Sequence, residues 1–243
     1  WLGGRKPNSL TVSFNSSVQR TSVAEFDLNG DFIPRAFNEF NASLKVTGVT
    51  LGLGRRLEWP DSYFTLTNSI GYLVYTLNNY NTQGLGFGDG KANSFTFNST
   101  LSRNRIDNSM YPKNGSSISL NVALTPPYSL WRDLDYETAE NAEKYKWIEY
   151  HKWMFDAKHY LNLAGKLVLE SKAHFGFIGS YSDQAGIGPF ERFNLGGDGL
   201  AGQNFILGTE VIGLRGYENN AITPPDYGLG ATPLTSGQIR GGV

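Results

Sequence analysis

One arginine stands out because of its neighbours. The run Gly213-Leu214-Arg215-Gly216-Tyr217 places a single arginine between two glycines and beside an aromatic residue. A guanidinium carries five donors in a rigid fork, and flanking glycines let backbone pack closely around it. The pattern suits a buried bidentate pair between Arg215 and a carboxylate. The alternative is an exposed loop arginine beside turn glycines, which is the usual place for an arginine.

The other residues that could do chemistry form no catalytic or metal-binding pattern. The glycine run of residues 84–91 has the spacing of neither a dinucleotide fingerprint nor a P-loop, and residues 27–31 resemble a calcium loop only in composition. His151, His159 and His174 form no ligand pair, there is no G-x-S-x-G elbow, and the chain has no cysteine. We therefore predict a protein that is not an enzyme and uses no cofactor or metal.

The composition excludes several classes of protein. Hydrophobic residues make up 40% of the 243 residues, but no apolar run approaches the roughly 18 residues of a membrane helix. The net charge is -1 and the basic residues are scattered, which argues against a nucleic-acid partner. Because residue 1 is Trp1 and no signal sequence follows, we expect a mature or trimmed piece of a longer protein.

Hydrophobic residues alternate with a period of two in the middle of the chain, which predicts strands. The clearest segments are residues 95–102, 117–124 and 167–181; less regular strands are expected near 8–17, 42–56, 62–78 and 146–161. The apolar register of the second of these shifts by one at Gly48, so we predict a bulge there. The only helix expected is a short one within residues 138–146.

Long and short connections take turns between these strands. The long ones, residues 18–41, 79–91, 126–145 and the stretch after 182, are rich in Gly, Asn and Pro, and the short ones lie near residues 58–61, 111–115 and 163–166. An up-and-down sheet of this kind is typical of an outer-membrane β-barrel. Aromatic residues near the strand ends would form its interfacial girdles: Trp59, Tyr63, Tyr80, Tyr111, Trp147, Trp153 and Tyr181. A soluble β-sandwich is the alternative.

In such a barrel the polar face of each strand lines a wet lumen. The expected lumen charges come from two neighbouring strands and are Lys152, Asp156, Lys158, Glu170, Lys172 and His174. In the alternative fold they would be solvated charges on an exposed sheet face.

The stretch Gly188-Pro189-Phe190-Glu191-Arg192-Phe193-Asn194-Leu195-Gly196-Gly197-Asp198, followed by Leu214-Arg215-Gly216-Tyr217, resembles the sixth extracellular loop of the BamA family. That family's loop reads aromatic-x-x-Phe-x-x-Gly-Gly and then has an Arg-Gly-aromatic tip that tucks into the barrel. The resemblance implies a loop base of Phe190, Phe193, Gly196 and Gly197, and a loop-anchoring tip of Gly213, Arg215, Gly216 and Tyr217. The turn at residues 111–115 and the opening residues 1–13 resemble other parts of the same family.

The family has a 16-strand antiparallel transmembrane β-barrel with long extracellular loops and short periplasmic turns. The resemblance therefore implies that residues 1–243 are a fragment of one such barrel, with about seven strands in 8–181 and a lumen-inserted loop in 182–243. The POTRA domains, the remaining strands and the acidic partner of Arg215 would lie outside this sequence.

The family's activity, as the resemblance implies it here, is to fold and insert β-barrel proteins into the outer membrane of a Gram-negative bacterium without nucleotide. The implied partners are nascent outer-membrane β-barrel proteins, accessory assembly lipoproteins, periplasmic chaperones and outer-membrane lipid. Three alternatives remain open: a dedicated TamA-like or two-partner-secretion transporter of the same superfamily, a passive porin, and a soluble carbohydrate-binding sandwich.

Overall fold

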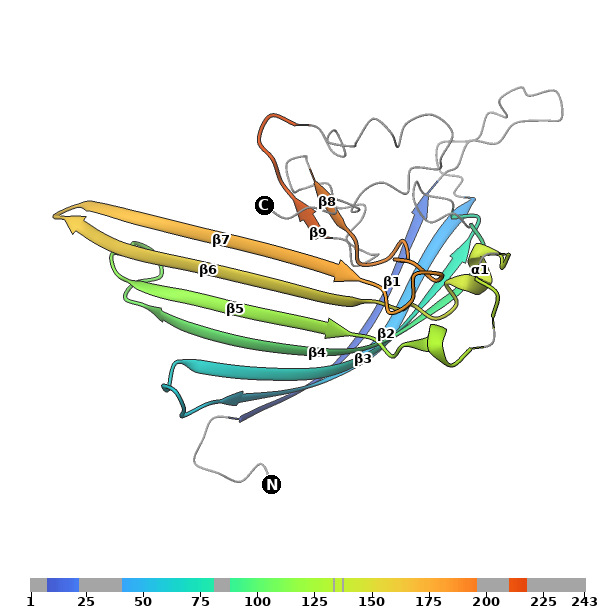
Figure 1. Ribbon diagram of the computed structural model, residues 1–243, viewed down its shortest axis with the longest axis horizontal. Helices are drawn as coiled ribbons and strands as arrows, with labels where there is room; N and C mark the ends of the chain where they lie inside the picture. Colours follow the sequence, from blue (N-terminus) through green and yellow to red (C-terminus); the bar gives the residue numbers. More distant parts are fainter. Residues whose placement is uncertain are drawn as a thin grey trace.

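The computed structural model describes residues 8–21, 41–80, 88–132, 134–136, 138–195 and 210–217. Seven antiparallel strands in these ranges form one sheet in which each strand lies beside its neighbour in sequence (Figure 1). The strands are β1 (Asn8–Thr21), β2 (Ala42–Arg56), β3 (Phe64–Asn78), β4 (Gly90–Ile106), β5 (Gly115–Leu124), β6 (His151–Ala164) and β7 (Leu167–Gly179). The predicted all-β, antiparallel, up-and-down sheet is confirmed.

The alternation of connections is confirmed as well. Short turns at 57–63, 107–114 and 165–166 join β2 to β3, β4 to β5 and β6 to β7, which defines the turn end of the sheet. Longer connections lie at the opposite, loop end, where the short helices η1 (Tyr128–Leu130) and α1 (Asn141–Lys144) are found. No helix among the described residues is long and apolar enough to cross a membrane.

Strands β1 and β7 are the two edges of this sheet, so the sheet does not close within the described residues. Closure into a 16-strand barrel therefore stays a prediction. Two further strands, β8 (Phe193–Leu195) and β9 (Glu210–Ile212), form a separate parallel pair. The pair lies above the concave side of the sheet, which we call the inner face (Figure 1).

The opposite, outer face carries the exposed apolar side chains. Cross-strand register aligns them in rows, because paired residues of neighbouring strands point to the same side of a sheet. One row is Val12, Leu51, Ile70, Phe97 and Leu124, and the next-but-one row includes Leu101, Leu120, Phe155 and Phe175. Phe14, at 75% exposure, and Val12, at 66%, show how open this face is. A broad, exposed apolar face is what lipid contact requires.

Among the described residues, the buried core lies on the inner face at the loop end. It consists of Ala42, Leu44, Val46, Tyr75, Leu77, Tyr80, Ala92, Ala123, Ile148, Tyr150, Ile178 and Phe190. The apolar pattern of β2 therefore changes sides along the strand: inward at Leu44 and Val46, then outward at Val49 and Leu51.

This change of side corrects the prediction of a bulge at Gly48. Pairing runs without a shift through Asn15↔Gly48 and Gly48↔Leu73, so the strand is regular there. The apolar register shifts because the buried face of β2 changes, not because a residue is inserted. The register irregularity that the structure does contain lies in β6, between Asn162 and Ala164.

The exposure of the aromatic residues fits the predicted girdle for some of its members and contradicts it for Tyr80. At the turn end, Trp59, Tyr63 and Tyr111 are exposed, as interfacial residues should be. At the loop end, Tyr80 is only 3% exposed and belongs to the inner core, so its assignment to the girdle was wrong. A period-two pattern cannot distinguish a lipid-facing ring from one that packs beneath a loop.

Candidate functional site: a loop docked on the inner face

The chain after β7 folds back onto the inner face of the sheet. Phe190 is 2% exposed and packs on Tyr75 of β3, with ring centroids 5.0 Å apart. It belongs to the same buried cluster as Tyr150 and Ile178. A buried phenylalanine stabilises a contact by about 3 kcal/mol or more relative to alanine, so Phe190 is the main apolar anchor of this segment.

Arg192 fixes the shape of the segment. Its side chain reaches back along the chain, where Nε donates to the carbonyl oxygen of Gly188 and Nη2 donates to that of Ile187, both at 2.6 Å. The residue is only 5% exposed. Hydrogen bonds from a charged donor are stronger than neutral ones, so Arg192 holds residues 187–192 as a compact turn.

A second anchor is an ion pair between the sheet and the segment. Lys152 Nζ of β6 lies 3.5 Å from a carboxylate oxygen of Glu191, and the lysine side chain is 6% exposed. The same ammonium lies 4.8 Å from the ring centroid of Phe193, which is cation–π distance. Glu191 has a positive φ of 60°, a backbone conformation that a glutamate adopts only when its surroundings hold it there.

The surroundings of Glu191 also change its acidity. Burial raises its pKa to about 7, although Lys152 acts in the opposite direction, and the nearby Glu210 adds to the rise. The loop therefore carries a carboxyl group that titrates near neutral pH beside a buried lysine.

Strands β8 and β9 bring the two halves of the loop together and place Glu210 over the sheet. Phe193 pairs with Glu210, and the Glu210 amide donates to the carbonyl of Arg192 at 3.0 Å. Glu210 Oε1 lies 3.8 Å from His174 Nε2 of β7, and His174 Nδ1 lies 2.6 Å from Asp156 Oδ1 of β6. Asp156, His174 and Glu210 thus form a polar chain from sheet to loop.

Glycine at position 176 makes room for this arrangement. A Cβ atom there would lie 2.7 Å from the Phe193 ring, closer than real Cβ atoms approach other atoms. Gly176 pairs with Met154 and lies on the inner face between His174 and Ile178. The missing side chain is therefore what lets the loop strand approach β7.

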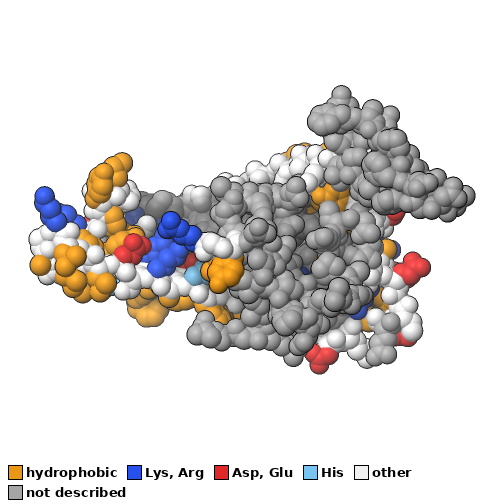
Figure 2. Space-filling view, turned by 90° about the horizontal axis from the view of Figure 1, so that it is seen from above, with side chains coloured by type: hydrophobic (Ala, Val, Ile, Leu, Met, Phe, Trp, Pro, Cys, Tyr) orange, Lys and Arg blue, Asp and Glu red, His pale blue; other side chains and the backbone are white. Residues whose placement is uncertain are grey.

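The structure puts all six predicted lumen charges on the inner face. Pairings Asp156↔His174 and Lys158↔Lys172 align the two strands, and Figure 2 shows charged side chains gathered on the part of this face that is not covered. Of the six, Lys152 and His174 contact the loop. Asp156 contacts His174. Glu170 instead accepts a hydrogen bond from the Tyr160 hydroxyl at 3.1 Å. Whether the inner face is a barrel lumen stays a prediction.

The predicted anchoring tip is present but is not buried among the described residues. Arg215 is exposed, and so are Gly213 and Gly216. Gly216 has a φ of +88°, and the amide of Tyr217 donates to the carbonyl of Leu214 at 3.2 Å, so the tip is a turn. The carboxylate partner of Arg215 remains a prediction. Of the loop base, Phe190 and Phe193 contact the sheet, whereas Gly196 and Gly197 lie outside the described residues.

Sequence reasoning missed most of the partners that hold the loop. Tyr75, Gly176, Glu191 and Glu210 contribute through contacts between segments far apart in the chain, which no spacing in the sequence reveals. Arg192 could have been found, because an arginine between a glutamate and a phenylalanine in an apolar, glycine-bounded run is as isolated as Arg215. No group of acidic, histidine or cysteine side chains in the described ranges could hold a metal ion.

Fold and site together define a class: an antiparallel sheet with a lipid-type outer face and a long loop anchored on its inner face. The comparisons agree with this class. The chain matches the Omp85 superfamily domain over residues 4–242, and it belongs to that superfamily. Comparison with curated proteins finds no match. Members of the superfamily are outer-membrane proteins of Gram-negative bacteria and of organelles, with roles in barrel assembly or transport.

Proposed function

We propose that the chain is part of a BamA-like insertase in the outer membrane of a Gram-negative bacterium, which folds and inserts β-barrel proteins without nucleotide. Superfamily membership supports a role in barrel assembly or transport. The loop motifs at Phe190 and Arg215 resemble those of the BamA family, and TamA-like and two-partner-secretion transporters of the same superfamily share this loop.

The proposed mechanism makes and breaks no covalent bond. A strand edge with unpaired backbone groups offers hydrogen bonds to an incoming strand of a client barrel. The loop keeps the barrel wall in shape while that edge opens, and Arg215 adds a contact to the inner wall. The proposed partners are nascent barrel proteins, accessory lipoproteins, periplasmic chaperones and lipid.

One observation carries this proposal: residues 187–195 are packed on the inner face through Phe190 and the Lys152–Glu191 pair. A passive porin needs a wet, open lumen. Here the inner face at the loop end is instead an apolar core that includes part of the loop. A docked loop is therefore better explained as a working part of an assembly or transport protein.

The direct test is assembly of an unfolded client barrel by the complete protein in proteoliposomes, followed by heat-modifiable gel mobility. We expect Phe190→Ala to slow assembly several-fold, because the loop loses its apolar anchor. Leu130→Ala is the matched control, since Leu130 lies in η1 at 65% exposure. If the wild-type protein assembles no client but conducts ions steadily, the insertase proposal fails and the porin alternative takes its place.

A further inference from the structure

The outer face carries a row of polar side chains close to the turn end. Register pairs Arg105 with Ser116, Ser116 with His159, and His159 with Ser171, so one row crosses β4, β5, β6 and β7. Neighbouring strands lie about 4.8 Å apart, so the row is roughly 14 Å long. These side chains lie on the outer face. They interrupt the exposed apolar residues of that face.

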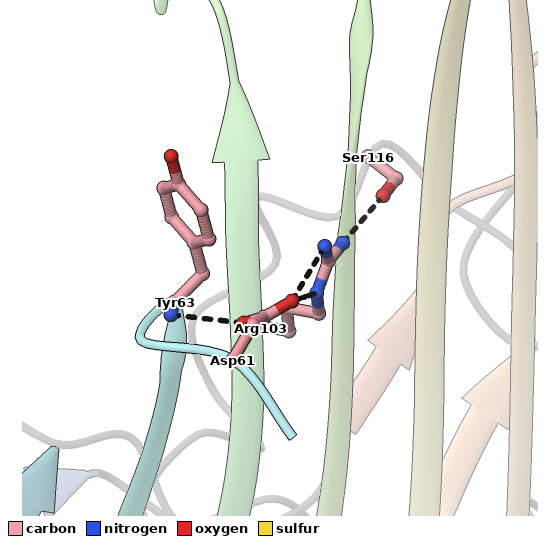
Figure 3. Close-up of polar contacts among 4 residues, drawn as sticks. All are labelled: Asp61, Tyr63, Arg103 and Ser116. Carbon is pink, nitrogen blue, oxygen red and sulfur yellow. Dashed lines mark hydrogen bonds and ion pairs between the residues drawn. The ribbon is translucent and has the colours of Figure 1, made fainter. Parts of the chain in front are cut away.

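At the β4 end of this row, Arg105 lies beside Arg103 of the adjacent outer-face row, and both contact the β2–β3 turn. Figure 3 shows the polar contacts of Arg103. Arg103 donates from Nε to Asp61 at 2.9 Å and from Nη1 to the Ser116 hydroxyl at 3.1 Å. The guanidinium of Arg105 lies over the Tyr63 ring, 5.5 Å from its centroid. Asp61 forms an ion pair with Arg103. Because this one carboxylate lies near two guanidinium groups, a net positive charge remains at Arg105.

Next to this row the outer face is hollowed by an apolar groove. The groove is an open hollow of about 360 Å³, lined by Leu120, Trp153, Met154, Phe155, Phe175 and Phe177. Phe155 and Phe175 are paired directly, and on each strand they lie two residues from the small Ala157↔Ala173 pair, on its loop-end side. The small pair separates the aromatic groove from His159 and Ser171. The order along the strands is therefore apolar groove, small residues, polar row.

We propose that the groove and the polar row form a binding site for one membrane phospholipid with an anionic head group. An acyl chain lies in the groove, and the phosphate accepts hydrogen bonds from Arg105, Ser116 and His159. Arginine suits this task because its planar fork matches phosphate oxygens, and stacking on an aromatic ring orients it. The site requires a lipid-facing outer face and does not depend on the insertase proposal.

The experiment is native mass spectrometry of the complete protein released from detergent micelles that contain added phosphatidylglycerol. We expect the wild-type protein to retain phosphatidylglycerol, and Arg105→Gln to retain at least threefold less. Phe175→Ala should lower retention as well, because the groove loses one wall. Lys172→Gln removes a positive charge from the inner face instead and should leave retention unchanged. Heat-modifiable mobility checks that each variant is folded, and His159→Gln replaces Arg105→Gln if the latter is not.

Inorganic phosphate in excess separates a lipid site from a site for free phosphate. If phosphatidylglycerol stays bound in excess phosphate, the groove and the polar row act together as a lipid site. Displacement of the lipid by phosphate alone overturns the role of the groove. Equal retention by folded wild-type, Arg105→Gln and His159→Gln proteins overturns the proposal.

Discussion

At the scale of single residues, the loop is held by a few contacts of different kinds. Phe190 supplies apolar burial, Arg192 shapes the turn, and Lys152 pairs with Glu191. An isolated buried lysine is costly, so the docked loop needs a carboxyl group at Glu191 beside Lys152, and the pair makes the docked position specific. Each contact can be removed separately.

Removal of the Phe190 ring should loosen the loop without disturbing the sheet. Phe→Ala in a packed core costs about 3–5 kcal/mol, which is large compared with the few contacts that hold this segment. We expect Phe190→Ala to lower the hydrogen-exchange protection of residues 187–195, with β4 and β5 unchanged. Phe14→Ala is the control, because Phe14 lies on the outer face. Equal protection of 187–195 in both variants would contradict the anchor role.

The docked loop should respond to pH through Glu191. Its pKa is raised to about 7 when docked, above the ordinary value of 4.5, so the docked state binds the proton more tightly. Docking should then weaken as pH rises from about 4.5 to 7 and change little above that. Protection factors of residues 187–195, corrected for intrinsic exchange, measure this. Glu191→Gln should remove the dependence; docking that strengthens with pH would contradict it.

Arg215 should matter for the complete barrel even though it is exposed here. We predict that Arg215→Ala lowers barrel stability and assembly rate and leaves overall secondary structure intact, because a carboxylate partner in later strands would lose its bidentate pair. The heat-dependent gel shift and the growth of cells carrying the variant measure the effect. If both are unchanged, the anchoring role of Arg215 is wrong.

At the scale of elements, the turns at the end of the sheet depend on backbone conformations that only some residues adopt. Gly115 begins β5 with a φ of +119°, and a Cβ atom there would overlap the backbone of Arg105 and Ile106. Gly165, in the β6–β7 turn, has a φ of +57°, and a Cβ atom added there would have no neighbouring atom within 4 Å. Both glycines thus have a positive φ, but only Gly115 is crowded by neighbouring backbone.

Alanine at these two glycines should have unequal effects. Gly165→Ala meets only the left-handed penalty of about 1 kcal/mol, whereas Gly115→Ala adds a backbone clash and should cost at least about twice as much. Urea unfolding of the refolded protein measures both free energies. Equal losses would show that the β4–β5 turn relaxes freely.

The strands could be predicted from the sequence because an exposed apolar face imposes a period of two on each of them. The assignment of faces could not be predicted throughout. In β2, Leu44 and Val46 face the core beneath the loop while Val49 and Leu51 face outward, and this mixture looked like a bulge at Gly48. Tyr80 was misplaced for the same reason, since only the folded loop end shows which aromatic rings are covered.

At the scale of the whole molecule, the loop and the charged residues of the inner face could be predicted from the sequence, but the contacts between them could not. Lys152 and His174 were predicted as lumen charges, and the structure gives each a carboxylate on the loop, Glu191 and Glu210. Such pairs join segments with no fixed spacing between them. The family could be inferred because the motif residues, unlike their partners, are close together in the chain.

The measurement that tests the central claim most directly is conditional depletion of the complete protein with quantitative proteomics of the outer membrane. The insertase account predicts that many unrelated β-barrel proteins fall together, because they share one route into the membrane. Loss of a single exported protein would contradict it and indicate a dedicated TamA-like or two-partner-secretion transporter. An unchanged outer membrane would contradict both and favour a passive porin.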